Sequence, residues 1–185
     1  MLIMKILITG VAGFIGFNFA RHLLSKNHVI FGIDNFDDYY SPKFKHLRIK
    51  ELKKSKKFHF KNIDITKKKI LKKYFLNKEF EFIFHFAAQA GVRYSMINPR
   101  KYIKVNKEGF ENIINNLNNI KSLKKVFYAS SSSVYGSRKK FPSSENLKLF
   151  PQSIYAKTKL QNEIFARKIS KKISYDLIGL RFFTV

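Results

Sequence analysis

The stretch TGVAGFIG, residues 9–16, follows the apolar run Ile6–Ile8 and opens a segment with helical apolar periodicity. This order predicts a strand, a glycine-rich turn and the first turn of a helix. Gly10 and Gly13 would let the backbone turn tightly and bring the pyrophosphate of a dinucleotide against bare N–H groups, and Gly16 would let the helix pack closely on the strand. The GxxGxxG spacing departs from the GxGxxG fingerprint, so a plain glycine-rich turn stays open on these residues alone.

An acidic residue downstream favours the dinucleotide site. Asp34 ends a second apolar run, residues 29–33, at about the twenty-residue offset where a carboxylate accepts hydrogen bonds from the adenosine ribose. The same carboxylate would repel a 2′-phosphate. The sequence therefore predicts NAD rather than NADP as the cofactor.

The composition is that of one domain with an excess of basic residues. The chain has 185 residues, 20 phenylalanines, no tryptophan and no cysteine. Lack of cysteine excludes disulfides and thiolate ligands, and the histidines show no ligand spacing, so we expect no metal site. The N-terminal segment, in which Met1 and Met4 are both candidate starts, resembles neither a signal peptide nor a membrane span of about twenty apolar residues. We expect a cytoplasmic protein without a membrane partner.

The formal net charge of +25 suggests an alternative, a protein that binds nucleic acid or another polyanion. The lysines are, however, spread along most of the chain, and runs such as residues 67–69 look like solvated helix faces. No recognised nucleic-acid-binding motif is present. We therefore expect no nucleic-acid partner, and polyanion binding is the least favoured hypothesis.

Apolar runs alternate with helical patterns along the whole chain. After the first strand, strands are predicted at 29–33, 58–60, 82–88, 126–129 and 175–181, and helices at 14–25, 43–54, 67–77, 98–119 and 153–171. Parallel neighbours need crossover helices, so this order predicts an α/β doubly wound (Rossmann) parallel sheet in a single domain, 1–185. We expect Phe14 on the inner face of the first helix and Thr66 as the N-cap of the third.

The segment 82–88 is apolar almost throughout, as a central parallel strand should be. It runs into the small residues Ala87, Ala88, Ala90 and Gly91, which leave room for a cofactor at the carboxyl end of the strand. Residues 137–152 are rich in Lys, Ser and Pro and are expected to form a surface loop that borders the site.

Tyr155 and Lys159 place a phenol and an ammonium four residues apart, on one face of a helix. A phenol with a pKa of about 10 must lose about three units to act as a base near neutral pH, and a lysine together with an oxidised nicotinamide can supply that shift. The YxxxK pattern alone arises by chance in many helices. Its place after a glycine loop and four serines, 130–133, makes chance a poor explanation.

In this order the glycine loop, the serine run and YxxxK resemble the extended short-chain dehydrogenase/reductase family of NAD-dependent epimerases and dehydratases. The stretches HFAAQAGVRYS (85–95), ASSSSVYG (129–136) and GLRFFTV (179–185) are most similar to its UDP-glucuronate 4-epimerase branch. The resemblance covers the whole chain and implies a UDP-sugar as substrate.

The resemblance also implies roles for individual residues. Tyr155 would be the catalytic base, Lys159 would lower its pKa and bind the nicotinamide ribose, and Ser131 would hydrogen-bond the reacting sugar oxygen. The implied cofactor residues are Gly10, Gly13, Phe14, Ile15, Gly16, Asp34, Asn35, Asp64, Ile65, Ala87, Ala88, Arg93 and Asn106, with Tyr155 and Lys159. The implied substrate residues are Ser132, Ser133 and Thr184.

The implied reaction is redox-neutral overall. Tyr155 takes the C4 hydroxyl proton while hydride passes to NAD, the 4-keto sugar turns over in the site, and hydride returns to its other face. Dehydratases of the family place an Asp-Glu pair after the position of Ser131, where this chain has Ser132 and Ser133, so dehydration ranks low. A UDP-glucose 4-epimerase is the closer alternative.

Family members are longer than this chain, and their substrate-binding region follows the position of Val185. A truncated, inactive NAD-binding domain is therefore an alternative of a different class. The family's association surface implies a homodimer through the helices near 98–119 and 153–171. Leu117, Ile164 and Phe165 are candidates for either the core or that interface.

Overall fold

The computed structural model describes residues 2–137 and 142–185, so residues 138–141 of the predicted loop 137–152 lie outside the described part. Within the described part, six strands form one sheet in the order β3-β2-β1-β4-β5-β6. All neighbouring strands are parallel, which confirms the predicted doubly wound fold. The strands are β1 (Lys5–Thr9), β2 (Val29–Asp34), β3 (Phe58–Asn62), β4 (Phe82–His85), β5 (Lys125–Ser131) and β6 (Asp176–Phe182).

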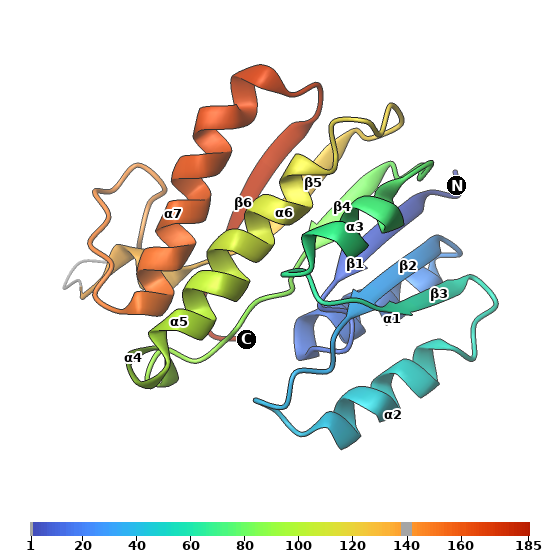
Figure 1. Cartoon of the computed structure of the whole chain (residues 1–185), viewed down its shortest axis with the longest axis horizontal. Helices are drawn as coiled ribbons and strands as arrows, with labels where there is room; N and C mark the ends of the chain where they lie inside the picture. Colours follow the sequence, from blue (N-terminus) through green and yellow to red (C-terminus); the bar gives the residue numbers. More distant parts are fainter. Residues whose placement is uncertain (1, 138–141) are drawn as a thin grey trace.

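Helices cover both faces of the sheet, as Figure 1 shows. α1 (Phe14–Ser25) and α2 (Pro42–Leu52) pack on one face, and α3 (Lys68–Phe75), α6 (Gly109–Asn115) and α7 (Ile154–Ile169) pack on the other. The shorter helical segments are α4 (Tyr94–Ile97), α5 (Pro99–Tyr102), the π-helical η1 (Ile103–Glu108) and the 3-10 turns η2 (Ser132–Tyr135) and η3 (Ser170–Lys172).

The helix predicted at 98–119 is shorter and less regular than its periodicity indicates. Pro99 occupies its first turn, and the side chain of Asn98 caps it by accepting a hydrogen bond from the Lys101 N–H at 3.3 Å. The helix then widens into the π-helical η1 and ends with α6 at Asn115. The side chain of Asn106 in this turn forms hydrogen bonds with the backbone of Gln89.

Two local predictions are wrong. Thr66 does not cap α3, because the carboxylate of Asp64 accepts the Thr66 N–H at 2.8 Å in a turn and α3 begins one residue later, with Lys67 at the cap. Phe14 does not face inward but is 57% exposed, because it stands at the first turn of α1, beside the cavity. The buried residues of α1 are Gly16 and Ala20.

β4 ends at His85, three residues before the predicted end, because the side chain of Thr9 replaces the regular ladder. The Thr9 hydroxyl is 2.7 Å from Nδ1 of His85 and accepts the Ala87 N–H at 3.1 Å. The Phe86 N–H still donates to the Thr9 carbonyl at 3.2 Å. The chain after His85 is thereby held over the end of β1.

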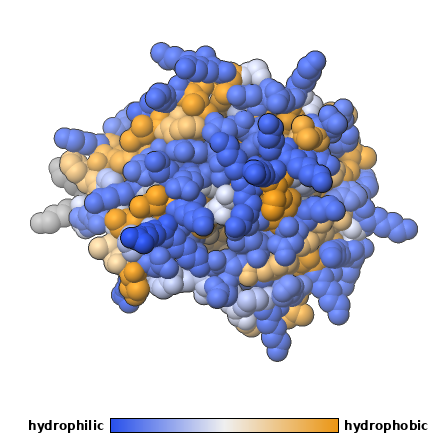
Figure 2. Space-filling view, in the orientation of Figure 1, coloured by the Kyte–Doolittle hydropathy of each residue, from blue (hydrophilic) through white to orange (hydrophobic). Residues whose placement is uncertain are grey.

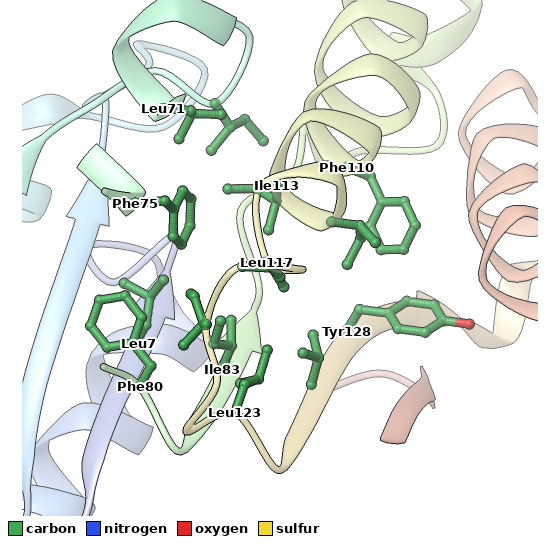
Figure 3. Packing of buried hydrophobic residues seen from close by; sticks show 14 of the residues in the cluster. Leu7, Leu71, Phe75, Phe80, Ile83, Phe110, Ile113, Leu117, Leu123 and Tyr128 are labelled. Carbon is green, nitrogen blue, oxygen red and sulfur yellow. The ribbon is translucent and has the colours of Figure 1, made fainter. Parts of the chain in front are cut away.

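The main core lies between the sheet and the helices α3, α6 and α7 (Figure 3). Phe110 of α6 packs on Tyr128 of β5, with ring centroids 5.0 Å apart. Leu117 is fully buried in this core, and Phe165 packs against Phe110 with a centroid distance of 6.0 Å. Ile164 is instead 56% exposed. The structure thus divides the three candidates that sequence could not separate.

The second core, on the α1 and α2 face, joins Ile6, Ile8 and Ile30 of the sheet to Ala20 and Ile49 of the helices. Polar side chains are spread across the face seen in Figure 2, with apolar groups scattered among them. No helix within residues 2–137 and 142–185 is long and apolar enough to cross a membrane.

Candidate functional site

A cavity of about 740 Å³ opens at the carboxyl ends of β1, β2, β4 and β5. In open α/β sheets ligands bind there, where the winding of the chain reverses between β1 and β4. The cavity brings together most of the residues that the sequence indicated. Those lining it are Gly10, Gly13, Phe14, Ile15, Gly16, Asp34, Asn35, Asp64, Ile65, Ala87, Ala88, Ser131, Tyr155 and Lys159.

The glycine loop lines the cavity and leaves no room for side chains at Gly10 and Gly16. Gly10 has φ +70°, and a Cβ there would lie 2.6 Å from the Ala87 nitrogen. A Cβ at Gly16 would lie 2.3 Å from the Gly10 carbonyl oxygen. These positions accept only glycine, so α1 starts close against the loop with its first N–H groups and positive dipole end beside the cavity.

The carboxylate of Asp34 is fixed at the floor of the cavity. It accepts the Ala12 N–H at 3.1 Å and the Phe36 N–H at 2.9 Å, and the residue is only 8% exposed. The Asp34 carbonyl accepts the Ile63 N–H at 3.0 Å, which ties β2 to the segment that carries Asp64. Two backbone donors orient this carboxylate before any ligand binds.

Two cations line the cavity that the sequence reasoning did not single out. Arg48 of α2 donates to the Ala12 carbonyl of the glycine loop at 3.0 Å. Lys45 donates to the Asp37 carbonyl at 2.6 Å. Both lie in the basic helix predicted at 43–54, and the sequence offers no signal that separates them from their exposed neighbours.

The loop after β2 also closes on the cavity. Tyr39 and Tyr40 line it, and the Asp37 carboxylate forms an ion pair with Lys101 of α5 at 2.8 Å. Burial raises the pKa of Asp37, but hydrogen bonds from Lys101 and from the Tyr39 N–H outweigh it, so the pKa lies below its ordinary value. This ion pair holds the loop against α5.

Tyr155 and Lys159 lie on successive turns at the start of α7. Ser153 caps this helix by accepting the Ala156 N–H at 3.0 Å. The Lys159 ammonium lies 5.7 Å from the centre of the Tyr155 ring and donates to the Ala129 carbonyl of β5 at 2.8 Å. Burial lowers the pKa of Lys159 to about 8, because the low-dielectric surroundings disfavour its charged form.

The protein groups alone keep the Tyr155 phenol protonated. Burial raises its pKa, the hydrogen bond with Ser131 lowers it, and the nearby Tyr40 raises it, which leaves the pKa above its ordinary value. A further positive charge beside the phenol is therefore needed for a phenolate near neutral pH.

Asn106 and Arg93 do not line the cavity. Asn106, 2% exposed, accepts the Gln89 N–H at 2.7 Å and donates to the Gln89 carbonyl at 3.1 Å and to the Thr158 hydroxyl at 3.3 Å. Asn106 therefore does not line the cavity itself but supports the loop that carries the cavity-lining residue Gln89. Arg93 is exposed, outside the lining residues.

The residues suggested for the substrate lie beside the main cavity. Ser133 lines a second, smaller cavity of about 200 Å³ together with Gln152 and Ser153. Ser132 lies next to it in η2, and Thr184 is exposed beyond the end of β6; neither lines these two cavities. In the described residues no group of three or more potential metal ligands occurs.

A family model described as GDP-mannose 4,6 dehydratase matches residues 7–184. The chain belongs to this family. The resemblance to NAD-dependent epimerases and dehydratases is thereby confirmed.

Individual relatives narrow the comparison. The chain is 44% identical to Protein CapI of Staphylococcus aureus, with 98% of this chain and 54% of that protein aligned. It is 40% identical to UDP-glucuronate 4-epimerase 4 of Arabidopsis thaliana, over 97% of this chain and 41% of the relative. The chain spans about half the length of these relatives.

A solved structure with the same fold is the UDP-glucuronic acid 4-epimerase of Bacillus cereus in complex with UDP-glucuronic acid and NAD. Its TM-score is 0.89 at 33% identity, and the match covers 98% of this chain and 57% of that one. The six-stranded sheet described above is therefore shared with an NAD-containing epimerase.

Proposed function

We propose that this chain is the cofactor-binding part of an NAD-dependent epimerase that inverts C4 of UDP-glucuronate through a 4-keto intermediate. One observation carries the proposal: Tyr155, Lys159 and Ser131 line the same cavity as the glycine loop and Asp34. The Bacillus cereus complex with UDP-glucuronic acid and NAD supports the choice of sugar and cofactor.

The cavity residues fit NAD. The glycine loop and the N-terminus of α1, where a Cβ at Gly10 or Gly16 would collide with backbone, would hold the pyrophosphate. Asp34 accepts the adenosine ribose hydroxyls, and Lys159 binds the nicotinamide ribose. NAD, when bound, supplies the hydride acceptor and the positive charge that the Tyr155 phenol requires.

The chain's own residues handle the proton. Tyr155 takes the C4 hydroxyl proton as hydride leaves C4 and gives it back when hydride returns, so atoms and charge balance over the cycle. Ser131 lines the cavity together with Tyr155 and would hydrogen-bond the reacting oxygen. Ser133 would contact the sugar from the smaller cavity, and Ser132 and Thr184 would contact it from positions outside the two cavities. Asn106 would support the cofactor through Gln89, and Arg93 would reach it from outside the lining residues.

The first alternative is a UDP-glucose 4-epimerase, which would use the same three catalytic residues on another sugar. Solved UDP-glucose 4-epimerases share the fold, for example that of Thermotoga maritima at a TM-score of 0.84 and 25% identity. Dehydration is less favoured, because Ser132 and Ser133 cannot expel water as an Asp-Glu pair does. A domain that binds NAD without turnover is the remaining alternative.

The proposal also covers assembly and location. A cytoplasmic homodimer forms through the adjacent helices α5 to α7, where Ile103 is 42% and Ile164 56% exposed. Residues 1–185 form one cofactor domain, and a region matching the part of the relatives that this chain does not span would complete the sugar site.

The decisive experiment compares two proteins. One is this chain, and the other is this chain fused to the C-terminal half of the Bacillus cereus epimerase. Both are titrated with NAD and assayed for conversion of UDP-glucuronate to UDP-galacturonate. We expect both to bind NAD and the fusion to turn over orders of magnitude faster, because remote binding energy orients the reacting carbon.

Three outcomes would contradict parts of this proposal. Turnover of UDP-glucose but not UDP-glucuronate by the fusion would select the alternative sugar. Activity that survives Tyr155→Phe would remove the proposed base. Equal turnover by the short chain would show that the cofactor domain is sufficient.

A further inference from the structure

The most deeply buried ion pair among the described residues takes no part in the chemistry proposed above. Arg181 of β6 and Glu163 of α7 form a two-point contact, with NH2 to Oε2 at 2.7 Å and Nε to Oε1 at 3.0 Å. Their side chains are only 15% and 9% exposed. A buried ion pair is weak evidence for stability, since apolar residues of similar volume often replace one without loss, so its position needs another reason.

The pair contacts the segment that carries the serine run. The Ser130 hydroxyl donates to Oε1 of Glu163. Arg181 donates from NH1 to the Tyr135 hydroxyl at 3.1 Å and to the Glu145 carbonyl at 3.1 Å. One pair therefore joins α7, the end of β5, η2 and the loop that borders the site.

Glu163 continues the line of Tyr155 and Lys159 along α7, since the three residues are spaced four apart. Lys159 donates a hydrogen bond to the Ala129 carbonyl, and Glu163 accepts one from the Ser130 hydroxyl. Two successive turns of α7 are therefore hydrogen-bonded to two successive residues of β5. The next residue, Ser131, lines the cavity together with Tyr155 and lowers the pKa of its phenol.

We propose that the Glu163–Arg181 pair positions Ser131 against Tyr155 by fixing Ser130 and η2 to α7. Both are positioning residues, because neither lines the cavity. The inference rests on the proposed role of Tyr155 as base and adds the groups that set its geometry. Ser131 is held on its other side by its own turn, where its hydroxyl accepts the Ser133 N–H at 3.2 Å.

Glu163 stays ionised in this arrangement. Burial raises its pKa, but hydrogen bonds from Arg181 and Ser130 lower it by more, so the net pKa lies below its ordinary value. An ionised carboxylate is acceptor-only, so the Ser130 hydroxyl proton must point at Glu163. This hydrogen bond thereby fixes the orientation of Ser130 at the end of β5.

The titration of Tyr155 reports this positioning. The groups that face its ring are Lys159 on α7, Tyr102 on α5, Tyr40 in the loop after β2 and Ser131 at the end of β5. Of these, the Ser131 hydrogen bond lowers the phenol pKa. Displacing Ser131 should therefore raise it.

The test replaces the pair with apolar residues, Glu163→Leu together with Arg181→Met, which leaves the net charge unchanged. The Tyr155 phenol is followed by fluorine NMR of the fluorotyrosine-labelled chain, its resonance assigned by loss in Tyr155→Phe. We expect its titration midpoint to move to higher pH while unfolding stays cooperative. An unmoved midpoint in the folded double variant would overturn the proposal.

The matched control is the exposed pair of Lys125 on β5 and Asp176 on β6, 3.1 Å apart, which shares strand β6 with Arg181. Lys125→Met with Asp176→Leu should leave the midpoint unchanged, and an equal shift there would mean a nonspecific effect and refute the inference. The single variant Glu163→Leu separates the effect of moving Ser131 from the effect of changing the charge near Tyr155. It leaves the Arg181 cation unpaired, which would lower the phenol pKa by charge alone, whereas loss of position raises it.

Ser130→Ala is a milder variant that deletes one hydrogen bond and no charge. It should shift the midpoint in the same direction by less, and no shift would contradict the inference even if the double variant did not fold. In the fused active chain, the double variant should lower kcat roughly tenfold with a smaller change in KM. If the unaltered fusion has no epimerase activity, the proposed function fails while the titration of Tyr155 still tests positioning.

Discussion

At the scale of single residues, the choice of cofactor depends on the carboxylate of Asp34. Backbone N–H groups of Ala12 and Phe36 already orient it, so a ribose with free hydroxyls meets a fixed acceptor. A 2′-phosphate would meet a negative charge that cannot turn away. Arg48 and Lys45 add positive charge nearby, on the α2 side of the cavity.

We therefore predict that the chain binds NAD at least about tenfold more tightly than NADP, since a charge-assisted hydrogen bond contributes about 1.5–3 kcal/mol. Asn35→Arg places a cation beside Asp34 and should shift the preference toward NADP. Calorimetric titration with both dinucleotides measures the ratio. The exposed Asn119→Arg is the control, and comparable affinities in the unaltered chain would contradict the role of Asp34.

Burial of Lys159 predicts a pH-dependent stability. Its pKa is about 8 in the folded chain and 10.5 as the unperturbed value, so between these pH values the unfolded chain binds more protons and folding becomes more favourable as pH rises. In Lys159→Met this gain, about 3 kcal/mol, should be missing. Urea unfolding at a series of pH values measures it. The exposed Lys157→Met should follow the unaltered chain, and a parallel profile for Lys159→Met would refute the assignment.

At the scale of secondary-structure elements, η1 is the feature that shapes the cavity from behind. Asn106 presents an amide to the backbone of Gln89 as a neighbouring strand would, donating to its carbonyl and accepting its N–H. The Asn162 side chain donates to the Asn106 carbonyl at 2.9 Å. The π-helical turn is thus fixed on both sides.

Asn106→Leu should lower the free energy of unfolding by about 2–4 kcal/mol, because it leaves buried backbone groups of Gln89 without partners. It should also weaken NAD binding, since Gln89 lines the cavity. Denaturant unfolding and titration measure the two effects. Asn115→Leu, on the exposed side of α6, should change stability by less than about 0.5 kcal/mol. Equal effects of both variants would argue against a special role for η1.

At the scale of the whole molecule, α5, α7 and η1 lie side by side on the outside of the domain (Figure 1). Ile103 and Ile164 expose apolar side chains there, while Leu117 and Phe165 belong to the core. This surface is the one proposed for the homodimer.

Ile164→Glu should convert a dimer to a monomer, because an unpaired charge buried at an interface is costly. Sedimentation equilibrium at micromolar concentration measures the mass. Ile70→Glu replaces a similarly exposed isoleucine, 52% exposed on α3, and should leave the mass unchanged. A monomeric unaltered chain would refute the proposed dimer.

The sequence by itself determined the features that depend on short spacings. The helix predicted at 14–25 is observed at Phe14–Ser25, because hydrophobic periodicity and the glycine turn act within a few residues. The glycine loop, Asp34, Tyr155 and Lys159 were identified by spacing or by resemblance and lie around one cavity. The parallel direction of the strands follows from the alternation of strands and helices along the chain, since parallel neighbours require crossovers.

Only the tertiary structure decided which distant groups meet. Arg48 reaches the carbonyl of Ala12, and Arg181 reaches Glu163, across separations that no local pattern encodes. The same holds for the early end of β4 at His85 and for the π-helical turn at Asn106, which depend on Thr9 and Gln89 from other elements. In a basic sequence the local pattern does not distinguish a buried charged side chain from a solvated one, because burial depends on neighbours that the fold brings together.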